Sequence, residues 1–169
     1  MPYSSTLFKK EIKDHIIKYI SKDATILDIG AGCGTYGSML RNDFKKIDAI
    51  EIYEPNVHRF GLMDIYRTVY VNNILEFKKI DDYDYFILGD VLEHMETKDA
   101  QYLIQKITYS GKFCLVAVPY NYEQGEYEGN KYEIHLQPDL TKEVFLERYP
   151  EMIFLMGDEH YGYFINYNY

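Results

Sequence analysis

The sequence Thr25-Ile26-Leu27-Asp28-Ile29-Gly30-Ala31-Gly32-Cys33-Gly34 carries the strongest structural signal in this chain. Its first half is β-branched and apolar, as a parallel strand that is buried on both faces requires. Its second half is rich in glycine, which permits positive φ and lets a ligand approach the backbone where a Cβ would collide. A helix is expected to follow from about Tyr36. The run therefore predicts a nucleotide-type site at the carboxyl end of a first strand.

Asp28 stands just before the first glycine and helps to separate two classes of cofactor. A fixed carboxylate at this place would repel the pyrophosphate of a nicotinamide or flavin cofactor. It would suit a cofactor with sulfonium and ammonium groups, and S-adenosylmethionine is such a cofactor. Gly30, Gly32 and Gly34 give G-x-G-x-G, whereas Gly32, Gly34 and Gly37 also give G-x-G-x-x-G. A strand that ends just before Gly30 favours the first pattern.

With Asp28 included, the run resembles motif I of the class I S-adenosylmethionine-dependent methyltransferases. Strands and helices alternate along the chain, so the resemblance extends from about Ile12 to Tyr167. Two strands over 152–156 and 161–166 match the antiparallel hairpin of that family. The resemblance implies one α/β domain over residues 1–169, with a doubly wound, mostly parallel seven-stranded sheet. It also implies helices on both faces of the sheet and a C-terminal antiparallel hairpin.

Periodicity and turn residues predict the remaining elements. Ser4-Ser5-Thr6 is expected to cap an N-terminal helix within residues 1–20, and Thr97 to cap a later helix that ends at Gly111. Residues 120–138 show no clear period and are predicted to form a substrate lid after the fifth strand. Further helices are expected over 36–42, 55–60 and 141–148, and strands over 47–52, 68–71, 83–88 and 113–118.

Acidic and amide side chains follow the second and third strands. Glu51 ends the second strand, where its two oxygens fit a vicinal ribose diol, although a nicotinamide site would use an acid there too. Ile52 is expected to pack on the adenine. Asn73 stands where the family commonly has an acid that receives the adenine amino group, and it is either that acceptor or a turn residue. The predicted cofactor-binding residues are Asp28, Gly30, Ala31, Gly32, Gly34, Glu51, Ile52, Asn73, Ile74 and Asp90.

The sequence Gly89-Asp90-Val91-Leu92-Glu93-His94 follows the fourth strand, at the same predicted sheet edge as the glycines. It resembles the Leu-Glu-His region of many small-molecule methyltransferases. Asp90 is expected to face the cofactor or the substrate, and His94 is a candidate general base. Alternatively, Glu93 and His94 cap the following helix or hold the loop, because methyl transfer often requires no more than approximation and orientation.

The predicted lid contains a second pair of candidates. Glu133 and His135 are two residues apart, so they share a face if the chain is extended there. His135 is either a second candidate base or a structural hydrogen-bond donor. Asp90, His94, Glu133 and His135 have the side chains of zinc or iron ligands. They lie far apart in sequence and include no helical His-x-x-x-His pair, so no metal site is predicted. The predicted substrate contacts are Glu93, Tyr120 and Glu133.

Composition limits the kinds of partner. The formal net charge is −9, which argues against a nucleic-acid partner because phosphate binding needs clustered Lys and Arg. Cys33 and Cys114 are the only cysteines, and they imply no disulfide framework. The sequence shows no signal peptide and no apolar run long enough to span a membrane, so a cytoplasmic protein without a membrane partner is expected.

The resemblance implies methyl transfer to a small or modular acceptor, such as a hydroxyl on a sugar, a glycan or another metabolite. Two other functions stay open. The first is a nicotinamide-dependent oxidoreductase, against which Asp28 counts. The second is a non-catalytic module that binds S-adenosylmethionine or S-adenosylhomocysteine, and Asn73 in place of an acid is its only sequence hint.

Overall fold

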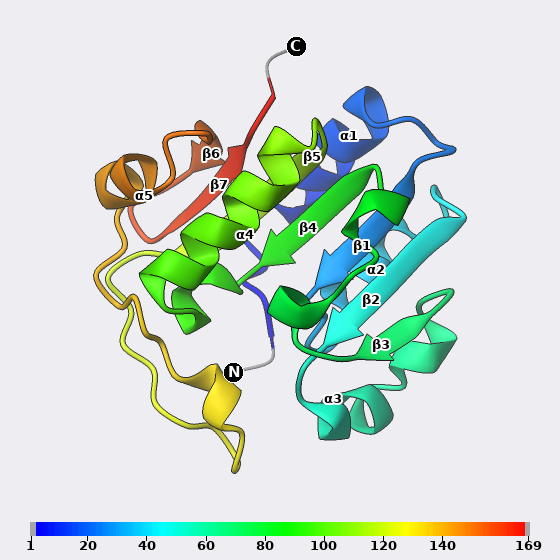
Figure 1. Cartoon of the computed structure of the whole chain (residues 1–169), viewed down its shortest axis with the longest axis horizontal. Coiled ribbons are helices and arrows are strands. Elements are labelled where there is room, and N and C mark those ends of the chain that lie inside the picture. The colour runs from blue at the N-terminus through cyan, green and yellow to red at the C-terminus, as the bar shows by residue number, and fades with distance from the viewer. Residues whose placement is uncertain (1–2, 168–169) are drawn as a thin grey trace. The chain divides into compact units, whose positions relative to one another are not determined.

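The computed structural model describes residues 3–167 and falls into two units, residues 3–87 and 88–167. The first unit carries β1 (Thr25–Ile29), β2 (Lys46–Glu51) and β3 (Val69–Val71). The second carries β5 (Phe113–Pro119), β6 (Ile153–Gly157) and β7 (Tyr161–Ile165), and β4 (Tyr85–Gly89) contributes residues to both. The strands form a seven-stranded sheet in the order β3-β2-β1-β4-β5-β7-β6 (Figure 1). The predicted α/β fold, with a mixed, mostly parallel sheet and an antiparallel C-terminal hairpin, is confirmed.

In the first unit, parallel pairing sets the edge at which the strands end. Asp28 on β1 lies opposite Ala49 on β2, and Glu51 on β2 lies opposite Val71 on β3. Because parallel strands end at the same edge, the turn after β1 lies beside the end of β2, where the Gly30 N–H donates to the Ile50 carbonyl at 2.8 Å. The helices and 3₁₀ turns of this unit are α1 (Lys9–Tyr19), α2 (Thr35–Leu40), α3 (Glu54–Arg59), η1 (Leu62–Asp64), η2 (Ile74–Glu76) and η3 (Ile80–Asp82).

The predicted caps of two helices are wrong. Helix α1 begins at Lys9 after Phe8, which has a φ of 56°, and no side chain caps it. The Ser5 hydroxyl accepts a hydrogen bond from the Leu7 N–H instead, so it closes a turn before the helix. Thr97 is the first residue of α4 (Thr97–Tyr109) rather than its cap, which is Glu96. Serine and threonine near the start of a helix therefore indicate that a helix begins nearby, but they do not indicate the exact residue at which it begins.

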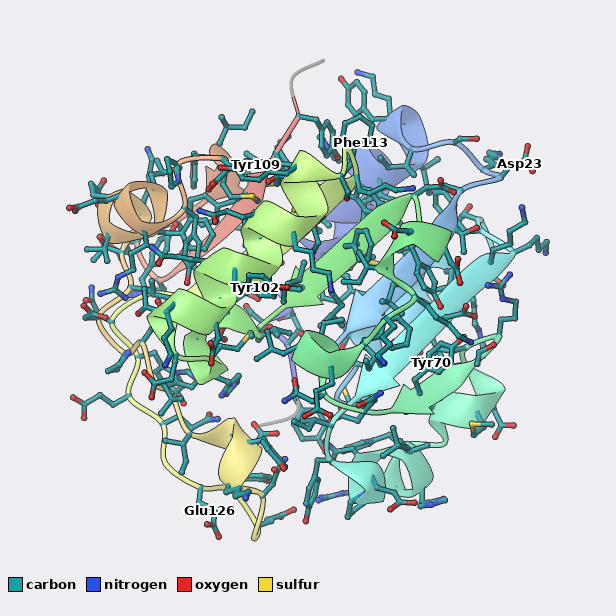
Figure 2. All side chains as sticks on the ribbon, viewed as in Figure 1. Asp23, Tyr70, Tyr102, Tyr109, Phe113 and Glu126 are labelled. Atoms are coloured by element: carbon teal, nitrogen blue, oxygen red, sulfur yellow. The ribbon has the colours of Figure 1, made fainter. Side chains whose placement is uncertain are left out.

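In the second unit, helix α4 packs against β5 (Figure 1). One face of α4 carries an apolar stripe. Ala100, Leu103, Ile104 and Ile107 form this stripe and are fully buried or nearly so. Tyr102 and Tyr109 project from α4 and are 56% and 77% exposed (Figure 2). The predicted helix over 141–148 is confirmed as α5 (Lys142–Arg148). Thr141 caps this helix, because its hydroxyl accepts a hydrogen bond from the Val144 N–H at 3.2 Å. Two 3₁₀ turns, η4 (Leu92–His94) and η5 (Lys131–Glu133), complete the unit.

The helices described within residues 3–167 are short. Among these residues, no helix combines the length and the apolar character that a membrane span needs. The longest helix, α4, has 13 residues and carries charged side chains.

Candidate active site

The turn after β1 is the glycine loop (residues 30–34), in which Gly30, Gly32 and Gly34 all have positive φ. The Gly34 N–H donates to the Ala31 carbonyl at 2.7 Å, which closes the turn before α2. At Gly34, φ is 78°, and a Cβ would lie 2.7 Å from the Ile65 side chain. A side chain at this position would therefore be strained and would also collide with Ile65.

Glu51 joins the end of β2 to the glycine loop. Its side chain is 4% exposed, and its Oε2 accepts a hydrogen bond from the Gly32 N–H at 2.8 Å. Its Oε1 accepts one from the Tyr53 N–H at 2.9 Å. A carboxylate oxygen can accept more than one hydrogen bond, so the same group can also receive the hydroxyls of a ribose. The structure thus holds the predicted diol acceptor beside the predicted loop.

Asp28 lies in the interior of the first unit, against Tyr66. The Tyr66 hydroxyl donates to the Asp28 carboxyl at 2.5 Å and accepts from the Gly37 N–H at 3.2 Å. Burial raises the pKa of Asp28 to about 7, while the Tyr66 hydrogen bond and the Lys9 charge oppose the rise. A Cβ on Gly37 would lie 2.3 Å from the Tyr66 ring, so this glycine makes room for the tyrosine. In this structure Asp28 therefore supports the start of α2 through Tyr66.

The residues predicted to contact the adenine lie at the ends of β2 and β3. Asn73 is the N-cap of η2, where its side-chain oxygen accepts from the Leu75 N–H at 3.0 Å. Ile74 is buried, and Ile52 is half-buried. The turn role considered for Asn73 is therefore present, and the adenine role stays a prediction.

In the second unit, Glu93, His94 and His135 form an acid–histidine cluster. Each residue offers one ligand atom, and these three atoms lie within 4.8 Å of one another. Glu93 and His94 come from η4, and His135 comes from the segment after η5. The two imidazole rings meet edge to face, with centroids 4.6 Å apart. Residues distant in sequence are thereby gathered in one place, although the sequence predicted no metal site there.

Glu93 is the unusual member of the acid–histidine cluster. It is 1% exposed, and within residues 3–167 neither of its carboxylate oxygens has a hydrogen-bond partner. Burial raises its pKa well above the ordinary value, and the negative charge of Asp90 raises it further. A buried carboxylate without donors is costly unless a cation or a proton compensates it. The environment of Glu93 therefore favours a bound positive charge.

Both histidines of the cluster are oriented by backbone carbonyls. His94 Nδ1 lies 3.2 Å from the Ile134 carbonyl, and His135 Nδ1 lies 2.7 Å from the Tyr122 carbonyl. A carbonyl can only accept, so each Nδ1 carries the proton and each Nε2 keeps its lone pair for a ligand. Burial, together with the His135 charge, lowers the pKa of His94 to about 4, and burial lowers that of His135. Both rings are thus neutral at neutral pH, the form that binds metals.

The other predicted residues of the second unit have different partners. Asp90 has a φ of 58°, and both of its carboxylate oxygens lie 2.8 Å from the Tyr161 hydroxyl that donates to them. The Glu133 carboxylate accepts from Asn130 Nδ2 at 3.2 Å and Gln124 Nε2 at 3.3 Å. Glu133 is therefore held within its own segment, whereas His135 joins the acid–histidine cluster.

Tyr120, the remaining predicted substrate contact, packs on β7. Its hydroxyl oxygen is buried and has no hydrogen-bond partner among residues 3–167. A Cβ on Gly162 would lie 1.8 Å from this oxygen, so the Tyr120 side chain fits only because position 162 is a glycine. The contact with Gly162 accounts for the packing of Tyr120, and its role toward a substrate stays a prediction.

The segment predicted as a lid, residues 120–138, is folded against η4. It doubles back on itself, with the His135 N–H donating to the Gln124 carbonyl at 2.9 Å. A hollow of about 420 Å³ lies beside His135 and is lined by Glu123, Gln124, Gly125, His135 and Pro138. Glu126 lies on the outer turn of the segment (Figure 2). The segment therefore offers a polar hollow next to the acid–histidine cluster.

The sequence alone matches no family model and no curated protein. The structure is similar to the methyltransferase domain of bacterial CtHen1, with a TM-score of 0.65 and 17% identity, over 92% of this chain and 95% of that chain. It is similar to the N-methyltransferase NodS from Bradyrhizobium japonicum WM9, with a TM-score of 0.62 and 13% identity, over 95% of this chain and 96% of that chain. Both of these neighbours are methyltransferases.

One further neighbour was solved with a cofactor product bound. It is 1,6-didemethyltoxoflavin-N1-methyltransferase from Burkholderia thailandensis, with bound S-adenosylhomocysteine. The TM-score is 0.62 at 14% identity, and the match covers 92% of this chain and 76% of that chain. At such identities the likeness establishes the fold, which is that of the methyltransferases.

Sequence reasoning missed three residues that support the site: Tyr66, Gln137 and Tyr161. Tyr66 fixes Asp28, and Tyr161 fixes Asp90. Gln137 is 2% exposed and bonds to the backbone of η4. None of them belongs to a local motif, so only the folded chain identifies them.

Proposed function

We propose that this protein is an S-adenosylmethionine-dependent methyltransferase that acts on a hydroxyl group of a small or modular acceptor. The observation that carries the proposal is the Glu51 carboxylate, fixed at the glycine loop by the Gly32 N–H. This arrangement fits an adenosine cofactor, because glycines admit the ligand and the carboxylate receives its ribose hydroxyls. When bound, the cofactor supplies a methyl group on an electrophilic sulfonium. The methyltransferase fold of the neighbours favours it over a nicotinamide cofactor.

The acid–histidine cluster is proposed to act on the acceptor through a divalent cation. One carboxylate and two imidazoles with Nδ1 protons on backbone carbonyls form a donor set that suits zinc, cobalt, manganese or iron. A cation there would compensate the buried charge of Glu93. It would also orient an acceptor hydroxyl and lower its pKa, which makes the oxygen a better nucleophile. His94 and His135 are then ligands rather than general bases.

The hollow beside His135 supports an acceptor that is small and carries no phosphate. Glu123 lines the hollow, and Glu126 and Glu128 are exposed in the same segment. These carboxylates would repel phosphate groups. A sugar or another neutral metabolite hydroxyl suits this environment better than a nucleic acid.

The cofactor is tested by calorimetric titration of the protein with S-adenosylmethionine, S-adenosylhomocysteine and NAD in parallel. We expect the first two to bind and a Glu51→Gln variant to bind them about 10- to 100-fold more weakly, because charged hydrogen-bond acceptors are lost. Binding of NAD alone would replace the proposal with the oxidoreductase alternative. Binding of S-adenosylmethionine without methyl transfer in a screen of hydroxyl acceptors would favour the non-catalytic module.

The cation is tested by titration with Co²⁺, whose visible absorption reports nitrogen and oxygen ligands. We expect saturable binding that is lost in His135→Ala. His160→Ala is the matched control, because this histidine is 78% exposed on the turn before β7. Equal Co²⁺ spectra for wild type and His135→Ala would exclude the cluster as the cation site.

A further inference from the structure

The turn that carries two members of the acid–histidine cluster is short and needs external support. η4 spans only Leu92–His94, and no side chain caps it. The Leu92 and Met95 carbonyls flank Glu93 and His94 on either side. A 3₁₀ turn of this length has little stability of its own, because its hydrogen bonds are few and poorly aligned. The positions of the Glu93 and His94 side chains therefore depend on what holds these carbonyls.

Gln137 holds the backbone of this turn from three directions. Its side-chain Nε2 donates to the Leu92 carbonyl at 2.7 Å and to the Met95 carbonyl at 3.2 Å. Its backbone N–H donates to the Glu93 carbonyl at 3.0 Å. The side chain is 2% exposed, so these bonds are shielded from water. A single residue thus contacts the carbonyls before, at and after Glu93.

Gln137 is itself fixed by α5 and the residue that follows it. Its Oε1 accepts from Arg148 Nη1 at 3.1 Å. The Tyr149 hydroxyl lies 2.9 Å from Nε2 and 3.1 Å from Oε1. Arg148 also pairs with Asp139. These contacts orient the amide, because Arg148 can only donate and therefore faces Oε1, whereas the carbonyls of η4 and Met95 can only accept and therefore face the NH₂ group. The rotamer of Gln137 is therefore set by partners outside the cluster.

Gln137 lies only two residues after His135, so one short segment both carries His135 and contacts the turn that carries Glu93 and His94. Leu136 donates its N–H to the Glu93 carbonyl at 2.7 Å, and Ile134 accepts from His94. Residues 134–137 thus run along η4, with His135 on the same short segment as Gln137. A shift of Gln137 would move Glu93 and His94 relative to His135.

We infer that Gln137 is a positioning residue, which sets the geometry of Glu93, His94 and His135 for a bound cation or acceptor. The inference rests on the proposed function of that cluster. Within residues 3–167, Gln137 makes no hydrogen bond to a side chain of the acid–histidine cluster, and it acts through the backbone of η4. Outer partners of metal ligands commonly change metal affinity by about 10- to 100-fold.

The test is Gln137→Met, which keeps the length and volume of the side chain and removes its donors and acceptor without adding charge. Gln101→Met is the matched control, because Gln101 Nε2 donates to the Arg148 carbonyl at 2.9 Å at the same end of α5. Within residues 3–167 its side chain makes no hydrogen bond to η4. We expect Gln137→Met to weaken Co²⁺ binding about 10- to 100-fold and to alter the Co²⁺ spectrum. Gln101→Met is expected to bind Co²⁺ like the wild type.

A second readout needs no cation. In the metal-free protein, the ring ¹⁵N shifts of His94 report whether its Nδ1 carries the proton. We expect the wild type and Gln101→Met to show the Nδ1–H form and Gln137→Met to show a mixture of tautomers. A wild type that binds no Co²⁺ would reject the proposed cation, and the ¹⁵N shifts would still decide the role of Gln137. Unchanged Co²⁺ affinity and unchanged His94 shifts in a folded Gln137→Met would overturn the inference.

Discussion

The glycine loop of the first unit and the acid–histidine cluster of the second are built by different means. The loop consists of consecutive residues, and Glu51, one strand further along the chain, secures it through a backbone N–H. The cluster joins η4 to a residue of a later segment, and each histidine is oriented by a backbone carbonyl. A site made of consecutive backbone can be recognised in sequence, whereas a site made of distant side chains depends on how the chain folds back.

The two regions also differ in how they treat a buried carboxyl group. Asp28, in the first unit, receives a hydrogen bond from Tyr66. The carboxylate oxygens of Glu93, in the second, have no hydrogen-bond partner among residues 3–167. A buried carboxyl group with a hydrogen-bond donor is typical of a structural residue, and one without a donor is typical of a ligand-binding site. Four predictions test this difference, from the largest expected effect to the smallest.

Glu93→Gln is expected to reduce Co²⁺ affinity by about 100-fold or more, because loss of a ligand should exceed the loss of an outer partner. The metal-free protein is expected to keep its stability, since an amide is less costly to bury than a carboxylate. Co²⁺ titration and urea unfolding measure the two quantities. A variant that binds Co²⁺ normally and unfolds more easily would make Glu93 a structural residue. Binding of S-adenosylmethionine serves as the control and is expected to persist.

Gly37→Ala is expected to lower the free energy of unfolding by about 1–3 kcal/mol, because a new Cβ would overlap the Tyr66 ring. Urea unfolding measures the change. Gly125→Ala is the matched control, since no atom lies within 4 Å of its Cβ position. If both variants were equally stable, the Tyr66 ring would have room to move and the Asp28 support would not be rigid.

The stability of the first unit is expected to depend on the proton of Asp28. Its pKa of about 7 exceeds that of an unfolded aspartate, so the native state holds a proton that the unfolded state has lost. The stabilising contribution is therefore complete below about pH 4 and is lost as pH rises through about 7, at up to about 1.4 kcal/mol per pH unit. Urea midpoints of wild type and Asp28→Asn between pH 4 and 8 measure it. Parallel pH profiles for the two proteins would show that Asp28 is charged in the native state.

Tyr161→Phe is expected to have the smallest effect, a loss of about 1 kcal/mol, because it removes one hydroxyl donor from the partly buried Asp90. Thermal unfolding compares it with Tyr109→Phe, whose ring is 77% exposed and whose stability should match the wild type. A loss in Tyr161→Phe no greater than in Tyr109→Phe would mean that water replaces the hydroxyl at Asp90.

Element types follow from the sequence because they depend on neighbouring residues. The alternation of apolar strands and amphipathic helices predicts the sheet, and the turn before Tyr161 predicts the hairpin that β6 and β7 form. The sequence does not predict the start of α1, because Phe8 before it adopts a left-handed conformation for which there is no residue pattern. Helix ends depend on single dihedral angles, and propensity does not fix these.

By itself the sequence determined the glycine loop, the acid at the end of β2 and the alternation of strands and helices. Each depends on the types of residue and on their short spacing in the sequence, and neither of these properties requires the chain to be folded. The tertiary structure alone decided that His135 meets Glu93 and His94 while Glu133 turns to Asn130 and Gln124. It also decided that Tyr66, Tyr161 and Gln137 hold the site. These contacts arise when segments far apart in the chain pack together, and the geometry of that packing is not encoded in any local run of residues.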